Sequence, residues 1–256
     1  MPNWCYTCHR MKGPIEALEQ LCNKLNEWTE KEYVGSSFGS MWLGNILAGC
    51  LIDTGACTAE TVEQEYERRE KITRAWHDAR VGALIAGKID QENIPEPDEE
   101  DRLPRHRGSL IEEPRIENGM LCVETETAWN DMADVFEWVI EKLGLPVEVY
   151  FLAEELGNGA YYTNDVTGDV FGKEYEFYVS GELYGEDTAD GTNEYFDEFP
   201  QMDRKEVIQL CGELLGRELD CQMSDDELDA VIAEVEAKDW RCKDSYVSIY
   251  RLQRGE

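Results

Sequence analysis

The chain is short of positive charge. Lysine and arginine together number 24, against 56 aspartates and glutamates, which gives a formal net charge of -32 over 256 residues. Binding to a nucleic-acid backbone depends on lysine and arginine releasing condensed counterions, and anionic membranes attract basic segments for the same reason. The composition therefore disfavours nucleic acids and membrane surfaces as partners, and leaves basic proteins, metal ions or only solvent.

The chain also lacks a long apolar run, and its first residues do not predict a secretion signal. The longest apolar run, residues 41–52, is interrupted by Gly44, Asn45 and Gly49, and it is shorter than the roughly 20 residues of a membrane-spanning helix. The first residues, MPNWC, contain no basic segment followed by an apolar one, as a secretion signal would. We expect a cytoplasmic protein whose nine cysteines are mostly reduced thiols.

Catalytic motifs are missing as well. With only three histidines, no serine–histidine–aspartate arrangement, glycine-rich phosphate loop or His-Glu-x-x-His run is present. Glu124 and Glu126 share one strand face and could pair with Glu154 or Glu155 as acid and base, but a chain with 56 acidic residues produces such pairs by chance. We therefore expect no enzymatic activity and no cofactor.

One motif contains thiols. Cys5, Cys8 and His9 spell the attachment signature of c-type haem and contain half of a zinc site. They lie in an alternating stretch typical of a strand, without a second cysteine or histidine pair. We expect ordinary strand residues, and a metal-dependent or thiol-based enzyme is the less favoured alternative.

A second motif contains oxygen ligands. Residues 164–169, NDVTGD, resemble the beginning of a calcium loop, with Asp165, Asp169 and Glu176 as weak candidate ligands. Counted from Asp165, the third position is threonine and the sixth is valine, where a calcium loop needs an acid and a glycine. An ordinary turn is favoured over a metal site.

Hydrophobic spacing predicts an α+β protein with a largely antiparallel sheet. Strands are expected at 3–12, 120–127, 146–153, 160–163, 174–180 and 246–252, with 160–163 and 174–180 forming a hairpin. Helices are expected at 15–28, 59–86, 129–143, 204–215 and 225–237, the last with a capping box from Ser224 to Glu227. The proline-rich residues 91–108 are expected to form a linker.

Negative charge is concentrated toward the C-terminal end. Residues 147–240 contain 26 acidic and 5 basic residues, whereas residues 1–146 contain 28 acidic and 15 basic ones. We expect one acidic surface that attracts a basic partner. Its carboxylates are Glu182, Glu186, Asp187, Asp190, Glu194, Asp197, Glu198, Asp225, Asp226, Glu227 and Asp229.

Short stretches spread over the first 180 residues share a further feature. They are MPNWC (1–5) followed by Gly13, WLGN (42–45), TETAW (125–129) and AEELGNG (153–159) followed by YTND (162–165). In this combination the chain resembles the YubB ferredoxin-like family of bacterial, phage and plasmid proteins. The resemblance implies a ferredoxin-like βαββαβ core within residues 1–182, with residues 36–108 as a helical insertion and linker, and it implies neither an iron–sulfur cluster nor catalytic residues. Residues 183–256 are then an acidic helical extension with a closing strand.

The acidic surface and the mobile-element setting that the resemblance implies lead to one functional expectation. We expect a non-enzymatic module that binds a basic host protein. In one form of this expectation, the module mimics nucleic acid and binds a host defence or nucleic-acid-processing protein. An acidic scaffold, whose charge serves solubility, is the alternative. Nucleic-acid binding through Arg68, Arg69, Arg74 and Arg80 is less favoured, because glutamates interleave with them.

Overall fold

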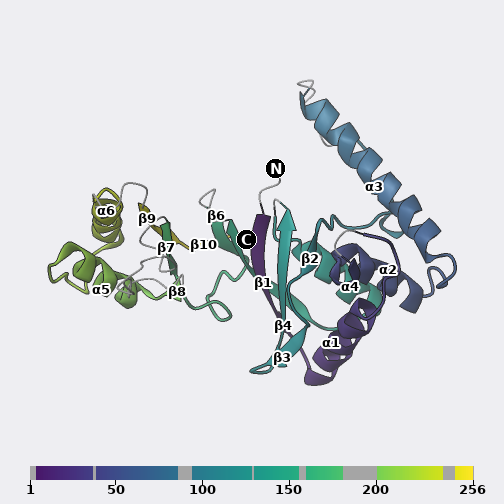
Figure 1. The fold of residues 1–256 in the computed structure, drawn as a ribbon, viewed down its shortest axis with the longest axis horizontal. Coiled ribbons are helices and arrows are strands. Elements are labelled where there is room, and N and C mark those ends of the chain that lie inside the picture. Colours follow the sequence, from purple (N-terminus) through teal and green to yellow (C-terminus); the bar gives the residue numbers. More distant parts are fainter. Residues whose placement is uncertain are drawn as a thin grey trace, which may run out of the picture. The chain divides into compact units, whose positions relative to one another are not determined.

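The computed structural model describes residues 4–36, 39–85, 94–128, 130–155, 160–180, 201–238 and 246–255. They form a mixed α+β protein with largely antiparallel sheets, as predicted (Figure 1). Contacts divide the chain into Met1–Phe151, here unit 1, and Leu152–Glu256, here unit 2. The division falls inside strand β5 (Glu148–Glu155), whereas the sequence predicts a domain boundary after residue 182. That predicted boundary lies within residues 181–200, which are outside the described part.

Unit 1 is built on an antiparallel sheet. Its strands are β1 (Trp4–Lys12), β2 (Gly108–Leu110), β3 (Arg115–Glu117), β4 (Met120–Ala128) and the beginning of β5. β1 and β4 are adjacent, with Trp4 opposite Ala128, while β2 and β3 both pair with the far side of β4 and β5 neighbours β1. The predicted alternation along β1 is confirmed, since Cys5, Thr7, His9 and Met11 are buried.

Helices of unit 1 cover one face of this sheet (Figure 1). They are α1 (Ile15–Thr29), α2 (Leu43–Asp53) and α4 (Ala133–Leu143). The long helix α3 (Val62–Ile85) follows α2 and extends away from the sheet (Figure 1). Leu25, Leu47, Val123 and Phe136 lie in the shared core. α4 begins later than its predicted start at Trp129, a residue outside the described part.

The sequence does not predict helix α2, because every residue from Leu43 to Leu51 is buried and no polar face marks a helical period. Asn45 in its first turn donates from Nδ2 to the carbonyl oxygens of Trp28 (2.7 Å) and Ser40 (3.0 Å). Its Oδ1 accepts from the Tyr33 N–H (2.6 Å). The hydrogen bonds of Asn45 hold the segment that follows α1 against α2. They give the WLGN stretch a structural explanation.

α3 confirms the predicted charged helix. Ion pairs at four-residue spacing join Glu65 to Arg69, Glu67 to Lys71 and Glu70 to Arg74, at 2.7, 3.4 and 2.8 Å. Thr73 fastens the helix to the predicted linker, because its hydroxyl exchanges hydrogen bonds of 3.2 and 3.0 Å with the backbone of Leu103. No helix among the described residues is long and apolar enough to cross a membrane.

Unit 2 contains a three-stranded antiparallel sheet packed against two helices. Its strands are β8 (Gln201–Met202), β7 (Tyr175–Ser180) and β9 (Tyr246–Arg251), and its helices are α5 (Arg204–Leu215) and α6 (Asp225–Glu236). Tyr175, Phe177, Val207, Leu228 and Ile249 form its core. The end of β5 pairs with β6 (Ala160–Thr163), which pairs in turn with β10 (Gln253–Arg254).

The predicted hairpin of residues 160–163 and 174–180 is wrong. β6 pairs with β5 and β10, whereas β7 pairs with β8 and β9. The Asp165 carboxylate accepts from the N–H groups of Gly168 (3.1 Å), Val170 (2.8 Å) and Phe171 (2.8 Å), so the connection closes on itself. Periodicity identifies both strands but cannot show which partner each one takes.

Candidate functional site

The predicted acidic surface is described only in part. Glu182, Glu186, Asp187, Asp190, Glu194, Asp197 and Glu198 lie outside the described residues. The other four predicted carboxylates, Asp225, Asp226, Glu227 and Asp229, are exposed in the first two turns of α6. What the structure says about this surface therefore concerns α6 and its surroundings.

Two of these four carboxylates have structural tasks. Glu227 completes the predicted capping box, accepting from the Ser224 N–H at 2.7 Å, and this backbone hydrogen bond lowers the pKa of Glu227. Asp225 pairs with Arg251 (3.0 Å) and with Arg204, and the hydrogen bond from Arg251 holds the pKa of Asp225 below its usual range. Both side chains serve the fold of unit 2.

Asp226 and Asp229 differ from them, because neither forms an ion pair with any described residue. They lie three residues apart on α6, and so point to one side of the helix. The described cations of unit 2 are mostly engaged elsewhere: Lys173 with Glu206 (2.6 Å), Arg254 with Asp165 (3.7 Å), Arg217 with Glu234, and Arg204 and Arg251 with Asp225. Unit 2 holds 27 acidic and 9 basic residues, so its surplus of 18 negative charges has no internal counterpart.

The weak metal candidates do not converge. Asp165 is buried, and burial alone would raise its pKa, but N–H donors from Phe171 and Val170 outweigh burial and lower it. Arg254 donates to the carbonyl oxygens of Asp165 and Phe171, both at 2.6 Å, which completes the turn. Among the described residues, no three histidine, cysteine, aspartate or glutamate side chains are grouped as metal ligands.

Glu176 instead meets another carboxyl group. Its side chain, 2% exposed on β7, is hydrogen-bonded to Glu154 on β5 within unit 2. No lysine or arginine of the described part forms an ion pair with either group. Burial, reinforced by the charge of Glu154, holds the pKa of Glu176 far above its usual range, and burial also raises the pKa of Glu154. The two carboxyl groups therefore retain a shared proton at neutral pH.

The surroundings of this carboxyl pair are polar but incompletely bonded. Tyr161 lies opposite Glu154 in the β5–β6 register, and its buried hydroxyl has no hydrogen-bond partner in the described part of the chain; the same holds for Glu176 Oε2. Gln201 donates from Nε2 to Glu154 Oε1 at 3.0 Å. Glu176 and Tyr161 are almost fully buried, whereas Glu154 is only partly buried.

The Cys5, Cys8 and His9 motif does not form a site. His9 points into the core of unit 1, with its ring 4.7 Å from that of Phe136 and its Nε2 3.1 Å from the Thr125 hydroxyl. Burial, and then the charge of Arg10, lowers the pKa of His9 to about 3. Cys5 shares this buried face, whereas Cys8 lies on the opposite face of β1, so the three side chains cannot bind one metal.

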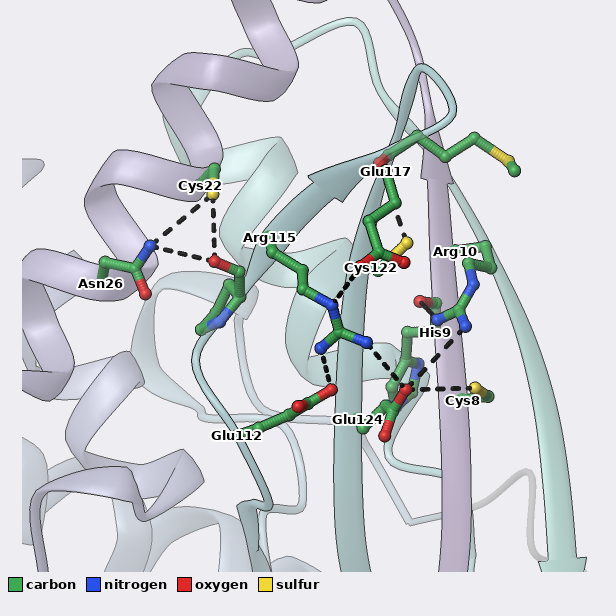
Figure 2. A network of polar contacts seen from close by, with 12 residues as sticks. Cys8, His9, Arg10, Cys22, Asn26, Glu112, Arg115, Glu117, Cys122 and Glu124 are labelled. Atoms are coloured by element: carbon green, nitrogen blue, oxygen red, sulfur yellow. Dashed lines mark hydrogen bonds and ion pairs between the residues drawn. The ribbon is translucent and has the colours of Figure 1, made fainter.

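Cys8 belongs to a charged network around Glu124 (Figure 2). Glu124 Oε1 lies 3.9 Å from Arg10 and 3.5 Å from Arg115, and its Oε2 accepts from the Tyr6 hydroxyl at 2.7 Å. Arg115 also pairs with Glu112 and Glu117. Glu124 binds arginine and tyrosine side chains of unit 1, and Glu154 contacts Glu176 and Gln201 of unit 2. Each of the two carboxyl groups considered from sequence as an acid–base pair thus has other partners.

No family model, no curated protein and no solved structure matches this chain. The resemblance to the YubB ferredoxin-like family stays a prediction, and the site has to be judged on its own chemistry.

Sequence reasoning missed the Glu154–Glu176 pair. Glu176 is apparent as an acid within an apolar strand, between Tyr175 and Phe177. That signal predicts a buried carboxyl group, but no sequence feature names its partner on another strand.

Proposed function

We propose that unit 2 binds a basic partner protein through carboxylates that its own cations leave uncompensated. The observation that carries this proposal is the exposed pair Asp226 and Asp229 on α6, which forms no ion pair with any residue that the structure describes, in a unit with 27 acidic and 9 basic residues. Such a surface accelerates encounter with a positively charged protein and makes the complex sensitive to salt.

A second inference narrows the class of partner. We infer that unit 1 has the ferredoxin-like βαββαβ topology and that the chain is related to the YubB family. The strand order β5-β1-β4-β2 supports this, with β2 and β3 taken as one interrupted strand and α1 and α4 as the two crossover helices. A mobile-element protein of this kind gains from occupying a basic channel on a host defence or nucleic-acid-processing protein, as a nucleic-acid mimic and without catalysis.

The test compares two charge reversals that change net charge equally. Asp226→Lys with Asp229→Lys alters the second and fifth residues of α6, and Glu16→Lys with Glu19→Lys alters the second and fifth residues of α1 in unit 1. Tagged wild type and both variants are used to capture proteins from nuclease-treated bacterial lysate at low and high salt.

We expect wild type and the α1 variant to capture the same basic protein, released by high salt or by added DNA, and the α6 variant to lose most of it. Equal capture by both variants would contradict a role for α6. Capture of no specific protein by wild type at either salt would contradict the proposal and favour the scaffold interpretation.

A further inference from the structure

A groove in unit 1 has the opposite chemistry to the acidic surface. It is an open groove between α3 and residues 104–107 with a volume of about 920 Å³, which is within the roughly 300–1,000 Å³ of small-molecule sites. Glu70, Arg74 and His77 line it from α3, and Arg105 and His106 line it from the facing segment. At about 1.5 Å per residue, the α3 wall from residue 70 to residue 78 is about 12 Å long.

One end of the groove is a fixed aromatic surface. The rings of Trp42, Tyr66 and His106 lie 5.5–5.7 Å from one another. His106 Nδ1 donates to the Pro104 carbonyl oxygen at 2.7 Å, so its Nε2 carries the lone pair that accepts from the Tyr66 hydroxyl. Burial lowers the pKa of His106, which keeps the ring neutral. Trp42 and His106 thus line the groove with rings that these contacts hold in place before any ligand binds.

Charged side chains line the other end of the groove, with Arg74 and Arg105 as its cations and Asp78, beside His77, as a carboxylate. Arg105 donates from Nη2 to His77 Nδ1 at 2.7 Å, so its described partner is a base and not a carboxylate. Burial, and then the charge of Arg105, lowers the pKa of His77, which leaves that ring neutral too. Burial raises the pKa of Asp134, the charge of Arg105 opposes this less strongly, and no ion pair joins these two side chains.

This arrangement is unusual in a chain with 56 acidic and 24 basic residues. Arg74, at the same end, is paired with Glu70 at 2.8 Å, whereas Arg105 keeps exposed N–H groups directed to no described acid. A planar guanidinium matches the two oxygens of a phosphate or carboxylate. An exposed arginine alone is often only solvated, but the size of the groove and the fixed rings that line it point to a ligand.

We propose that this groove binds a small organic oxyanion carrying a planar ring, the class to which nucleoside monophosphates belong. The oxyanion lies against Arg105 and Arg74, and the ring lies against Trp42 and His106. The groove belongs to unit 1 and uses none of the carboxylates of unit 2, so this inference does not depend on the proposed partner binding.

Calorimetric titration tests the proposal. The probes are the four ribonucleoside monophosphates, uncharged adenosine and inorganic phosphate, added to wild type, Arg105→Gln and Lys71→Gln. Lys71, 76% exposed on α3 and outside the groove, is the matched control for loss of one charge.

We expect at least one monophosphate to bind wild type, with its nucleoside and inorganic phosphate each at least tenfold weaker. Arg105→Gln should weaken binding about ten- to a hundredfold, because a charge-assisted hydrogen-bonded contact is lost, while Lys71→Gln changes it by less than about twofold. Circular dichroism checks that each variant is folded. The proposal is overturned if no monophosphate binds folded wild type, if binding survives Arg105→Gln, or if phosphate alone binds as tightly.

Discussion

Glu124 in unit 1 and Glu176 in unit 2 are both glutamates on sheet strands, yet their surroundings are opposite. Glu124 lies between Arg10 and Arg115 and accepts from the Tyr6 hydroxyl. Glu176 is more deeply buried and meets another carboxyl group, with one oxygen unpartnered in the described part. Position on a strand therefore does not determine whether a carboxylate stabilises the fold. The charged groups on neighbouring strands determine it.

The same contrast extends to each unit as a whole. In unit 1 the buried Asn45 uses both its donor and its acceptor atoms. In unit 2, Glu154 and Glu176 inside and Asp226 and Asp229 outside form no ion pair with a lysine or arginine of the described residues. Asn45 and Glu124 stabilise unit 1 through their partners, whereas the Glu154–Glu176 pair lowers the stability of unit 2. Four predictions test this difference.

The largest effect is expected for Asn45→Leu. The substitution leaves backbone groups of α1, the following loop and Tyr33 without their partner, and each buried unsatisfied group costs about 1–3 kcal/mol. We expect unit 1 to lose about 3 kcal/mol or more of unfolding free energy, measured by urea denaturation. Asn26→Leu is the control, because Asn26 donates only to Pro114 O and Cys22 Sγ. An equal loss for both variants would contradict the role given to Asn45.

The second effect concerns His9 and acid. Its pKa is lowered to about 3 in the folded protein, whereas the unfolded chain titrates near 6.5. Between these values only the unfolded state takes up the proton, so stability is lost as pH falls below 6.5. Unit 1 should lose about 2 kcal/mol between pH 7 and pH 5 from this group. Amide hydrogen exchange along β1 measures it, and in His9→Leu this part of the pH dependence should disappear.

The third effect has the opposite sign and belongs to unit 2. The pKa of Glu176 is raised on folding. Its contribution to the free energy of unfolding is therefore fully present below the ordinary glutamate pKa of about 4.3 and is lost as pH rises above that value. Glu176→Gln keeps a donor toward Glu154 without a titrating proton. We expect this variant to be more stable than wild type at pH 8, by at least about 1 kcal/mol, in hydrogen exchange along β7.

Glu124→Gln is the matched control for Glu176→Gln. It removes a carboxylate that two arginines flank, so it should destabilise unit 1 by about 1 kcal/mol at neutral pH. Stabilisation by Glu124→Gln, or destabilisation by Glu176→Gln at pH 8, would remove the difference drawn between the two units.

Much of the fold follows from local patterns. The alternation in β1, the apolar stripe of α1, the ion pairs of α3 and the capping box at Ser224 all follow from residues close in sequence, and all are found. The nonlocal features escape prediction. α2 has no polar face, the partners of β6 and β7 depend on the Asp165 turn, and the Glu154–Glu176 pair and the Arg105–His77 contact join residues from separate elements. Of the predicted acidic site, only the α6 carboxylates fall within the described residues.

The smallest effect on stability is expected for the two charge reversals. Asp226 and Asp229, like Glu16 and Glu19, are exposed, and substitutions at exposed positions without partners usually change stability little. Thermal unfolding should therefore give nearly the same midpoint for wild type and both variants. A large shift for the α6 variant alone would mean that Asp226 and Asp229 stabilise α6, as acids in a first turn can, and would remove the reason to assign them to a partner.

The salt dependence of partner capture by wild type, the α6 variant and the α1 variant tests the binding surface on unit 2 most directly. We expect the α6 reversal to abolish a salt-sensitive interaction with a basic protein, while the α1 reversal, with the same net charge, leaves it intact. Loss of capture in both variants to the same extent would show that only total charge matters, and would contradict a binding surface on unit 2.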